Sequence, residues 1–158
     1  MDRFLAKVIV KFPDHNTLMQ MIDISLDDEP SNHLATLVSS EELQQIMAAS
    51  REVVIAEPIK QAAVNLVLAT HADSELASPV AKKYFRYGAS PRGLQALLRA
   101  ARMVALADGR VHVAIDDIER VAMMTLRHRI LMNLESEMQG LKTDSLLTQL
   151  ISDWRQKH

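Results

Sequence analysis

Apolar and polar residues alternate with a period of two near the start of the chain. The apolar side of this alternation consists of Phe4, Ala6, Val8, Val10 and Phe12. A period of two in a β-branched stretch predicts a strand over residues 4–12, which Pro13 ends. A lone strand leaves a row of backbone groups unpaired, and no second stretch of that length has a strand pattern. We therefore expect that this segment is the end of a larger domain.

The next part of the chain has the spacing of amphipathic helices. Asp14 is placed to cap a short first helix, and Ser39 with Glu42 has the spacing of a capping box for a second one. A third helix is expected to begin near Pro58, because proline is favoured at the first helical position. Its apolar face would consist of Ile59, Ala62, Ala63, Leu66, Val67 and Thr70.

The strongest helix pattern follows Ser90. We predict that Ser90 caps this helix, that Pro91 is its first residue, and that Gly109 lies just beyond its end. Its inward face would consist of Leu94, Leu97, Leu98, Ala101, Val104 and Ala105. Two further helices are predicted, one after Asp117 and one capped by Thr143.

These patterns predict a mainly α fold class, a small helical bundle preceded by one strand and one helix. Residues 1–24 hold the strand and the first helix, residues 25–56 form a polar linker with a short helix, and residues 57–158 form the bundle. At 158 residues with 48% hydrophobic side chains, the chain is long enough to bury a core of its own.

The charge balance and the residue types exclude several classes of function. The 18 basic and 20 acidic residues nearly cancel, so no overall positive field would attract nucleic acid. With no cysteine, disulfides and thiolate metal sites are excluded, and the six histidines lack the spacing of a helical zinc site. No apolar run approaches the ~20 residues that cross a bilayer, so we expect no membrane association and a cytoplasmic location.

The chain also lacks a loop that could bind nucleotide phosphates by itself. Gly88 and Gly93 have P-loop spacing, but Leu94 and Gln95 follow them instead of the lysine and hydroxyl residue that hold phosphate and magnesium. We therefore expect that this chain alone does not hydrolyse ATP and binds no cofactor.

The densest group of candidate binding residues lies around the start of the helix after Ser90. Three aromatic residues, two arginines and two glycines fall within residues 84–93. A helix N-terminus attracts anions through its N–H groups and dipole, and an arginine at the second helical position adds two donors suited to phosphate. Arg92 is therefore a candidate phosphate sensor. The alternative is that Arg92 is a solvated first-turn residue and that the aromatic residues belong to the core.

Four short motifs of the chain resemble the C-terminal lid of MoxR-family AAA+ ATPases. They are Ala56-Glu57-Pro58, Thr70-His71-Ala72-Asp73-Ser74, Arg86-Tyr87-Gly88-Ala89-Ser90-Pro91-Arg92 and Leu126-Arg127-His128-Arg129-Ile130. Their order and spacing resemble the family from Asp2 to about Arg129. In such proteins the lid follows a P-loop core and supplies a sensor 2 arginine. The resemblance assigns that role to Arg92, with Ser90 and Pro91 beside it in the nucleotide-binding site.

The segment Asp2-Arg3-Phe4 resembles the Leu-Asp-Arg-Phe element at the end of the family's core. The resemblance makes residues 1–24 the end of an AAA+ core and Arg3 a candidate arginine finger. Such an arginine would reach the nucleotide of a neighbouring subunit and stabilise charge on the transferring phosphoryl group. The Walker A lysine, the Walker B acid and sensor 1 belong to the part of the core that this chain lacks.

The resemblance also implies a function for the intact protein. It would be a ring-forming, hexameric ATPase that uses ATP and magnesium and acts as a chaperone in the assembly or activation of protein complexes. The lid would couple ATP binding and hydrolysis to the conformation of the ring. Its partners would be its own AAA+ core, the neighbouring subunits and a von Willebrand A-domain protein.

Two other functions and one ambiguous motif remain open. Arg92, Arg99 and Arg102 lie near one helical face, as in helical DNA-binding modules, although the near-neutral charge opposes a nucleic-acid partner. The bundle could instead dock a protein through an apolar groove, without nucleotide chemistry. Residues 127–129 are basic, and they could either complement a helix dipole or contact a neighbouring subunit or nucleotide.

Overall fold

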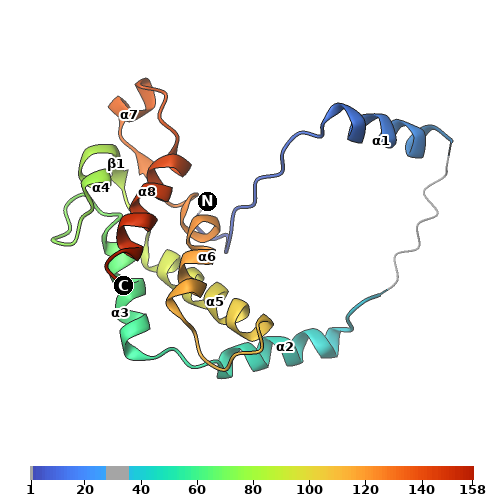
Figure 1. Ribbon diagram of the computed structural model, residues 1–158, viewed down its shortest axis with the longest axis horizontal. Helices are drawn as coiled ribbons and strands as arrows, with labels where there is room; N and C mark the ends of the chain where they lie inside the picture. Colours follow the sequence, from blue (N-terminus) through green and yellow to red (C-terminus); the bar gives the residue numbers. More distant parts are fainter. Residues whose placement is uncertain (1, 28–35) are drawn as a thin grey trace.

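The computed structural model describes residues 2–27 and 36–158 of the 158-residue chain. Most of its elements form one bundle; the N-terminus lies against this bundle, and the segment that leads to the first helix projects from it (Figure 1). The described elements are α1 (His15–Asp27), α2 (Ser40–Glu52), α3 (Glu57–Leu68), α4 (Pro79–Tyr84), β1 (Phe85–Tyr87), α5 (Pro91–Ala107), α6 (Ile115–Leu126), β2 (Leu131–Met132), α7 (Leu134–Met138) and α8 (Thr143–Arg155). The expected mainly α fold class is confirmed.

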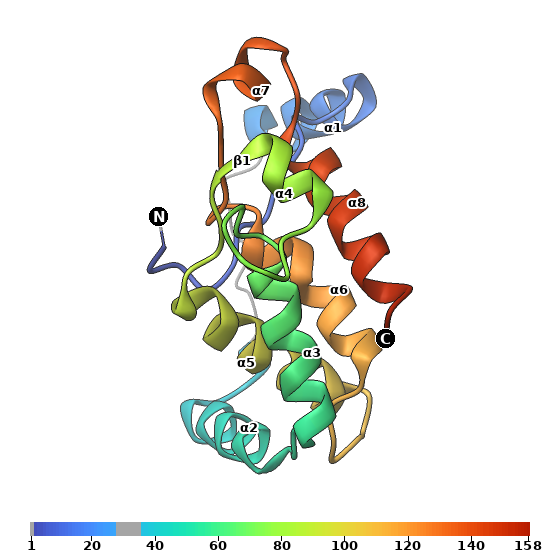
Figure 2. The ribbon, with the colours of Figure 1, turned by 90° about the vertical axis from the view of Figure 1, so that its left-hand side faces the viewer.

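The core of the bundle lies where α3, α5, α6 and α8 meet (Figures 1 and 2). Ala101 and Ala105 on α5 are fully buried, and their small side chains allow α6 to pack closely against this helix. Leu97 fills the space one turn earlier. α8 closes the core, because the buried indole of Trp154 donates a hydrogen bond of 3.0 Å to the carbonyl of Ala62 on α3.

Several predicted helix boundaries are confirmed. The Thr17 amide donates to the Asp14 carboxylate at 2.8 Å, which caps α1. Ser39 and Glu42 exchange both hydrogen bonds of the predicted capping box at the start of α2. Gly109 lies just beyond α5 with φ of +71°, the left-handed conformation that ends many helices.

The predicted cap position of Ser90 is confirmed without the capping bond of its side chain, and the predicted cap at Thr143 is wrong. Ser90 does precede α5, but its hydroxyl donates to the Asp2 carboxylate at 2.8 Å and makes no capping bond to the helix. Thr143 is the first residue of α8, after Lys142 at the capping position, and its hydroxyl contacts the sulfur of Met132. Both hydroxyls therefore have partners that are remote in sequence, which local spacing does not reveal.

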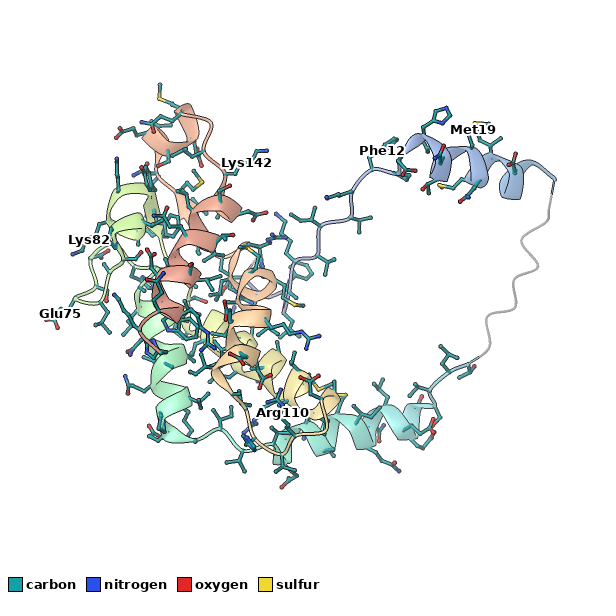
Figure 3. All side chains as sticks on the ribbon, viewed as in Figure 1. Phe12, Met19, Glu75, Lys82, Arg110 and Lys142 are labelled. Atoms are coloured by element: carbon teal, nitrogen blue, oxygen red, sulfur yellow. The ribbon has the colours of Figure 1, made fainter. Side chains whose placement is uncertain are left out.

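The predicted strand over residues 4–12 is not formed. Residues 4 and 5 form a bend and residues 6–12 have no regular secondary structure. None of them pairs with another strand in the described part of the chain, and the Lys7 amide instead donates to the Met124 carbonyl at 2.8 Å. Figure 3 shows Phe12 and Met19 on the projecting segment, away from the bundle. The alternating pattern needs a partner strand, and within residues 2–27 and 36–158 no strand pairs with this segment. We refer to residues 2–27 as the arm.

A small two-stranded sheet was missed by the sequence pattern. β1 and β2 pair antiparallel with Phe85 opposite Met132, and the register is irregular before Tyr87. Strands of three and two residues are too short to show an alternating period. The short helices α4, which precedes β1, and α7, which follows β2, were not predicted either.

The region between the arm and the bundle only partly overlaps the predicted linker. α1 continues to Asp27, residues 28–35 lie outside the described residues, and the apolar face of α2 stays exposed at Leu43, Ile46 and Met47. The segment boundaries at residues 24 and 56 stay predictions. None of the described helices is long and apolar enough to span a membrane.

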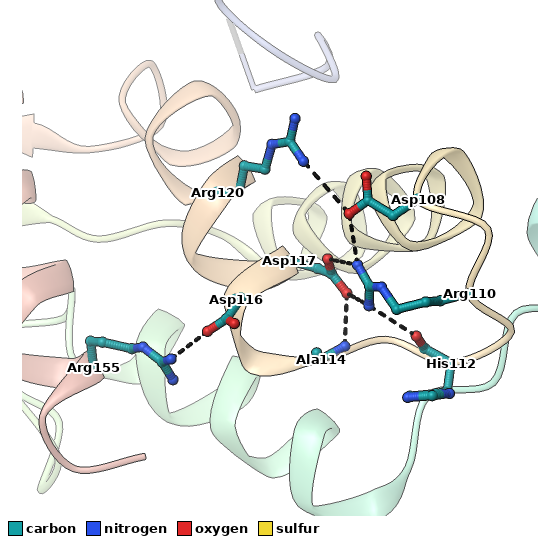
Figure 4. A network of polar contacts seen from close by, with 8 residues as sticks. All are labelled: Asp108, Arg110, His112, Ala114, Asp116, Asp117, Arg120 and Arg155. Atoms are coloured by element: carbon teal, nitrogen blue, oxygen red, sulfur yellow. Dashed lines mark hydrogen bonds and ion pairs between the residues drawn. The ribbon is translucent and has the colours of Figure 1, made fainter.

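A buried carboxylate in the first turn of α6 binds the segment that follows the end of α5 (Figure 4). Asp117 on α6 accepts two hydrogen bonds from Arg110, at 2.5 and 2.8 Å, and one from the Ala114 amide at 2.8 Å. Burial alone raises the pKa of Asp117, but these hydrogen bonds outweigh burial and hold the pKa below its ordinary value. The network therefore fixes the turn between the two central helices.

We predict that Asp117→Ala lowers the free energy of unfolding by about 2 kcal/mol at pH 7, because it removes two hydrogen bonds from Arg110, whose ion pair with Asp108 remains, and the acceptor of the Ala114 amide at the helix start. Since the pKa of Asp117 is lowered in the folded state, this contribution is present above the unfolded pKa of about 3.9 and is lost as the pH falls through the folded pKa. Urea titrations at pH 7 and pH 3 measure both effects.

Asp116→Ala is the matched control, because Asp116 lies in the same helical turn and its carboxylate pairs with Arg155 at the surface. Its expected effect is within about 0.5 kcal/mol. Equal losses for the two variants would contradict a special role for the buried pair.

Candidate functional site

The candidate site lies where α5 begins, after a loop that two side chains hold in place. The Thr70 hydroxyl accepts a hydrogen bond from the Ala89 amide at 2.9 Å and donates to the Val67 carbonyl at 2.6 Å. His71 Nε2 lies 2.9 Å from the Ala89 carbonyl, and because a carbonyl only accepts, Nε2 carries the proton. Both polar main-chain groups of buried Ala89 are thus satisfied by side chains.

Gly88 is required for this close packing. A Cβ atom at this position would lie 2.6 Å from the Thr70 hydroxyl oxygen and 2.7 Å from the Thr70 carbonyl oxygen. Such distances are shorter than van der Waals contact, so any larger residue would displace the loop. The glycine lets the Thr70 hydroxyl reach the Ala89 amide. Ala89 lies three residues before Arg92, so this contact holds the loop from which α5 begins.

Arg129 holds the arm against this helix start from the other side. It lies just beyond α6, and its side chain is only 2% exposed. The guanidinium donates to the Asp2 carboxylate and the Phe4 carbonyl, both at 2.5 Å, and to the main-chain carbonyl of Asp2. Its Nε donates to the Thr125 carbonyl at 2.8 Å. A buried charge costs several kcal/mol unless it is satisfied in this way.

The neighbouring basic residues also make contacts within the chain. Arg127 forms an ion pair of 2.9 Å with Asp144 on α8, and His128 Nε2 donates to the Phe4 carbonyl at 3.0 Å. The basic motif at residues 127–129 therefore does more than complement the dipole of α6, because it ties the arm and α8 to the end of that helix.

The arm and α5 enclose a pocket of about 290 Å³, which we call the arginine pocket. It is lined by Asp2, Arg3, Leu5, Arg92, Gln95, Ala96, Arg99 and Arg129. Arg3, Arg92 and Arg99 are exposed, and none of them has a hydrogen bond or an ion pair with the residues that the structure describes. Three unpaired guanidinium groups thus share a pocket with one carboxylate.

This arrangement fits a phosphate group. Planar guanidinium groups donate paired hydrogen bonds to phosphate oxygens, and three of them are available. The backbone offers less than the sequence suggested, because Pro91 has no N–H and the amides of Gly93 and Leu94 donate to the Ser90 carbonyl at 2.7 and 3.3 Å. Side-chain charge would therefore supply most of the attraction for an anion.

Asp2 limits the positive charge of the arginine pocket. Its pKa is lowered mainly by the hydrogen bond from Ser90, with further lowering from Arg129 and the charge of Arg92, so the carboxylate is ionised at neutral pH. Within residues 2–27 and 36–158, no cluster of three His, Asp or Glu side chains could hold a metal ion. The charged groups of the pocket are therefore arginine guanidinium groups and the single carboxylate of Asp2.

The structure brings the two predicted functional arginines, Arg3 and Arg92, into one pocket. Their roles in nucleotide chemistry stay predictions. Ser90 contacts Asp2 at the edge of the pocket, and Pro91 begins the helix without lining it.

The other two arginines of the pocket were not predicted as part of this site. Arg99 lies two turns after Arg92 on the same helix, and this spacing could have indicated it. Arg129 contacts Asp2 across 127 positions of sequence, a separation that leaves no local pattern.

Comparison with known proteins identifies similar chains. Residues 77–150 match the AAA lid domain family. The chain is 26% identical over 152 residues to the uncharacterized protein YeaC of Bacillus subtilis, covering 96% of this chain and 45% of YeaC. It is 27% identical over 135 residues to the chaperone MoxR1 of Mycobacterium tuberculosis, covering 85% of this chain and 35% of MoxR1.

A solved structure shares the fold. It is a candidate ATPase from Cytophaga hutchinsonii, which superposes with a TM-score of 0.83 at 27% identity and covers 96% of this chain and 46% of its own. The chain thus spans less than half the length of each of these three proteins.

We predict that Thr70→Val lowers the free energy of unfolding by about 1–2 kcal/mol, because valine leaves the buried Ala89 amide without an acceptor. Thr70→Ser keeps the hydroxyl and is the matched control, with a smaller expected loss. Chemical denaturation of the three proteins provides the measurement. A serine variant as unstable as the valine variant would show that the methyl group, and not the hydrogen bond, matters.

Proposed function

Because the chain carries the AAA lid domain of a MoxR-like AAA+ ATPase, we propose that its arginine pocket receives the terminal phosphates of ATP held by the P-loop core of that ATPase. Arg92 is the sensor 2 residue in this proposal. It donates to the γ-phosphate, and its contact distinguishes the ATP-bound state from the state after hydrolysis.

The observation that carries this proposal is an unpaired arginine on a fixed helix start. Arg92 is the second residue of α5 and is exposed in the arginine pocket without an ion pair to the described residues. The loop before it is held by Thr70 and His71. A rigid mount of this kind reduces the entropy that an arginine loses when it binds a ligand. A solvated first-turn arginine would need no such support.

Arg3 has a second role in the proposal. It lies across the pocket from α5 on the arm, and its guanidinium is also unpaired within the described residues. We assign to it the role of an arginine finger for the nucleotide of a neighbouring subunit. A positive charge there would stabilise the charge that develops on the transferring phosphoryl group.

The proposal for the intact protein follows from its relatives. It is a ring-forming ATPase that binds ATP and magnesium in a P-loop core, with this chain as the lid. The name of MoxR1 describes a chaperone, and we propose a similar chaperone activity in the assembly or activation of protein complexes, with a von Willebrand A-domain protein as one partner. Since α5 carries Arg92 and belongs to the bundle core, a contact with phosphate would move the whole lid and so change the ring.

We predict that Arg92→Ala, in this chain joined to a P-loop core, raises the KM for ATP by about tenfold or more, as expected for the loss of one charge-assisted contact. The matched control is Arg86→Ala, since Arg86 is also exposed but stacks on Tyr87 outside the pocket. Steady-state ATPase assays and equilibrium binding of ATP measure the effect.

Unchanged KM and unchanged ATP affinity in Arg92→Ala would rule out the sensor role. A similar loss in the Arg86→Ala control would indicate a general effect of surface charge.

A further inference from the structure

One guanidinium binds the backbone on both sides of Arg3. Arg129 donates to the main-chain carbonyl of Asp2, which precedes Arg3, and to the carbonyl of Phe4, which follows it. Two hydrogen bonds from one planar group fix the orientation of the peptide segment between them. Arg129, a residue of the bundle, therefore sets the position of the backbone from which the Arg3 side chain extends.

The same link reaches the start of α5. The Asp2 carboxylate accepts one hydrogen bond from Arg129 at 2.5 Å and another from the Ser90 hydroxyl at 2.8 Å. Ser90 is the residue before α5 and lies two positions before Arg92. A continuous chain of contacts thus runs from the backbone at Arg3 through Asp2 to the helix start that carries Arg92.

The first turn of α5 also packs on the stem of Arg129. A Cβ atom at Gly93 would lie 3.0 Å from Cδ of Arg129, which is tighter than ordinary van der Waals contact. The glycine therefore gives Arg129 the space it occupies. Because the Arg129 side chain is buried and fully engaged, it can move only together with both neighbours.

We propose that Arg129 and Asp2 are positioning residues that couple the two arginines of the pocket. A shift of the α5 start on phosphate binding is passed through Ser90, Asp2 and Arg129 to the backbone of Arg3, and a shift of Arg3 is passed back. This proposal rests on the proposed roles of Arg92 and Arg3. It adds that the phosphate contact of Arg92 and the position of the arginine finger depend on one shared set of hydrogen bonds.

The link is tested first in the 158-residue chain by distances between spin labels. The chain has no cysteine, so Lys7→Cys on the arm and Lys60→Cys on α3 allow labelling at these two sites alone. We expect one narrow distance distribution, which broadens in Arg129→Gln and, to a smaller extent, in Asp2→Asn. Arg127→Gln is the matched control, since Arg127 pairs with Asp144 and not with the arm, and it should keep the narrow distribution.

The coupling is tested in the chain joined to a P-loop core. Arg129→Gln and Asp2→Asn are expected to lower kcat by about tenfold with KM for ATP changed less than about twofold, because they displace Arg3 and leave Arg92 in place. Arg127→Gln should leave both constants unchanged. If Arg129→Gln does not fold, Asp2→Asn still tests the coupling, because the Asp2 side chain is 41% exposed and its replacement is not expected to unfold the chain.

The outcomes separate the two proposals. Normal kcat and a narrow distance distribution in Asp2→Asn and in any folded Arg129→Gln, with a raised KM in Arg92→Ala, would overturn the coupling and keep the sensor role. A broad distance distribution with unchanged kcat would also overturn it, because the arm would then be displaced without consequence for catalysis. No effect of Arg92→Ala on ATP binding would overturn the sensor role itself.

Discussion

The burial of one positive charge, that of Arg129, is the constraint on which the candidate site depends. A guanidinium removed from water needs acceptors for its N–H groups, and without them it would destabilise the fold by several kcal/mol. Three of the acceptors of Arg129 belong to Asp2 and Phe4, and the fourth is the Thr125 carbonyl. The arm must therefore lie at the start of α5. The arginine pocket, with Arg3 on one side and Arg92 on the other, is a consequence of that contact.

The rest of the bundle keeps the start of α5 in one place. Thr70 and His71 bind the loop before this helix, while the pair of Asp117 and Arg110 fixes the turn after it. Between these two ends, small buried residues of α5 pack closely on α6. The exposed end of the helix thus carries unpaired charge on a rigid support, which is how a binding residue is prepared for its ligand. We propose that this end of the helix faces the nucleotide.

Much of the fold could be predicted from the sequence, because amphipathic helices and their ends leave local patterns. The capping box of Ser39 and Glu42 and the end of α5 at Gly109 are such patterns, and Arg92 stood out because it follows Pro91 at a helix start. The role of Ser90 could not be predicted, since its hydroxyl prefers an ionised carboxylate from the first residues of the chain to the helix amides beside it. The basic motif at residues 127–129 allowed a contact with a neighbouring subunit or nucleotide, but the contact of Arg129 with Asp2 could not be predicted. The alternating arm was predicted as a strand because periodicity reports which side chains share a face, whereas a strand also needs a partner.

Hydrogen exchange of the backbone amides tests most directly whether the arginine pocket is the place where this lid meets nucleotide. The experiment compares the chain joined to a P-loop core with and without a non-hydrolysable ATP analogue. If the pocket receives the phosphates, exchange slows at the start of α5 and in the first residues of the arm, while the C-terminal half of α8, which does not line the pocket, is unchanged. Protection confined to the P-loop core, with both the start of α5 and the arm unaffected, would contradict this account.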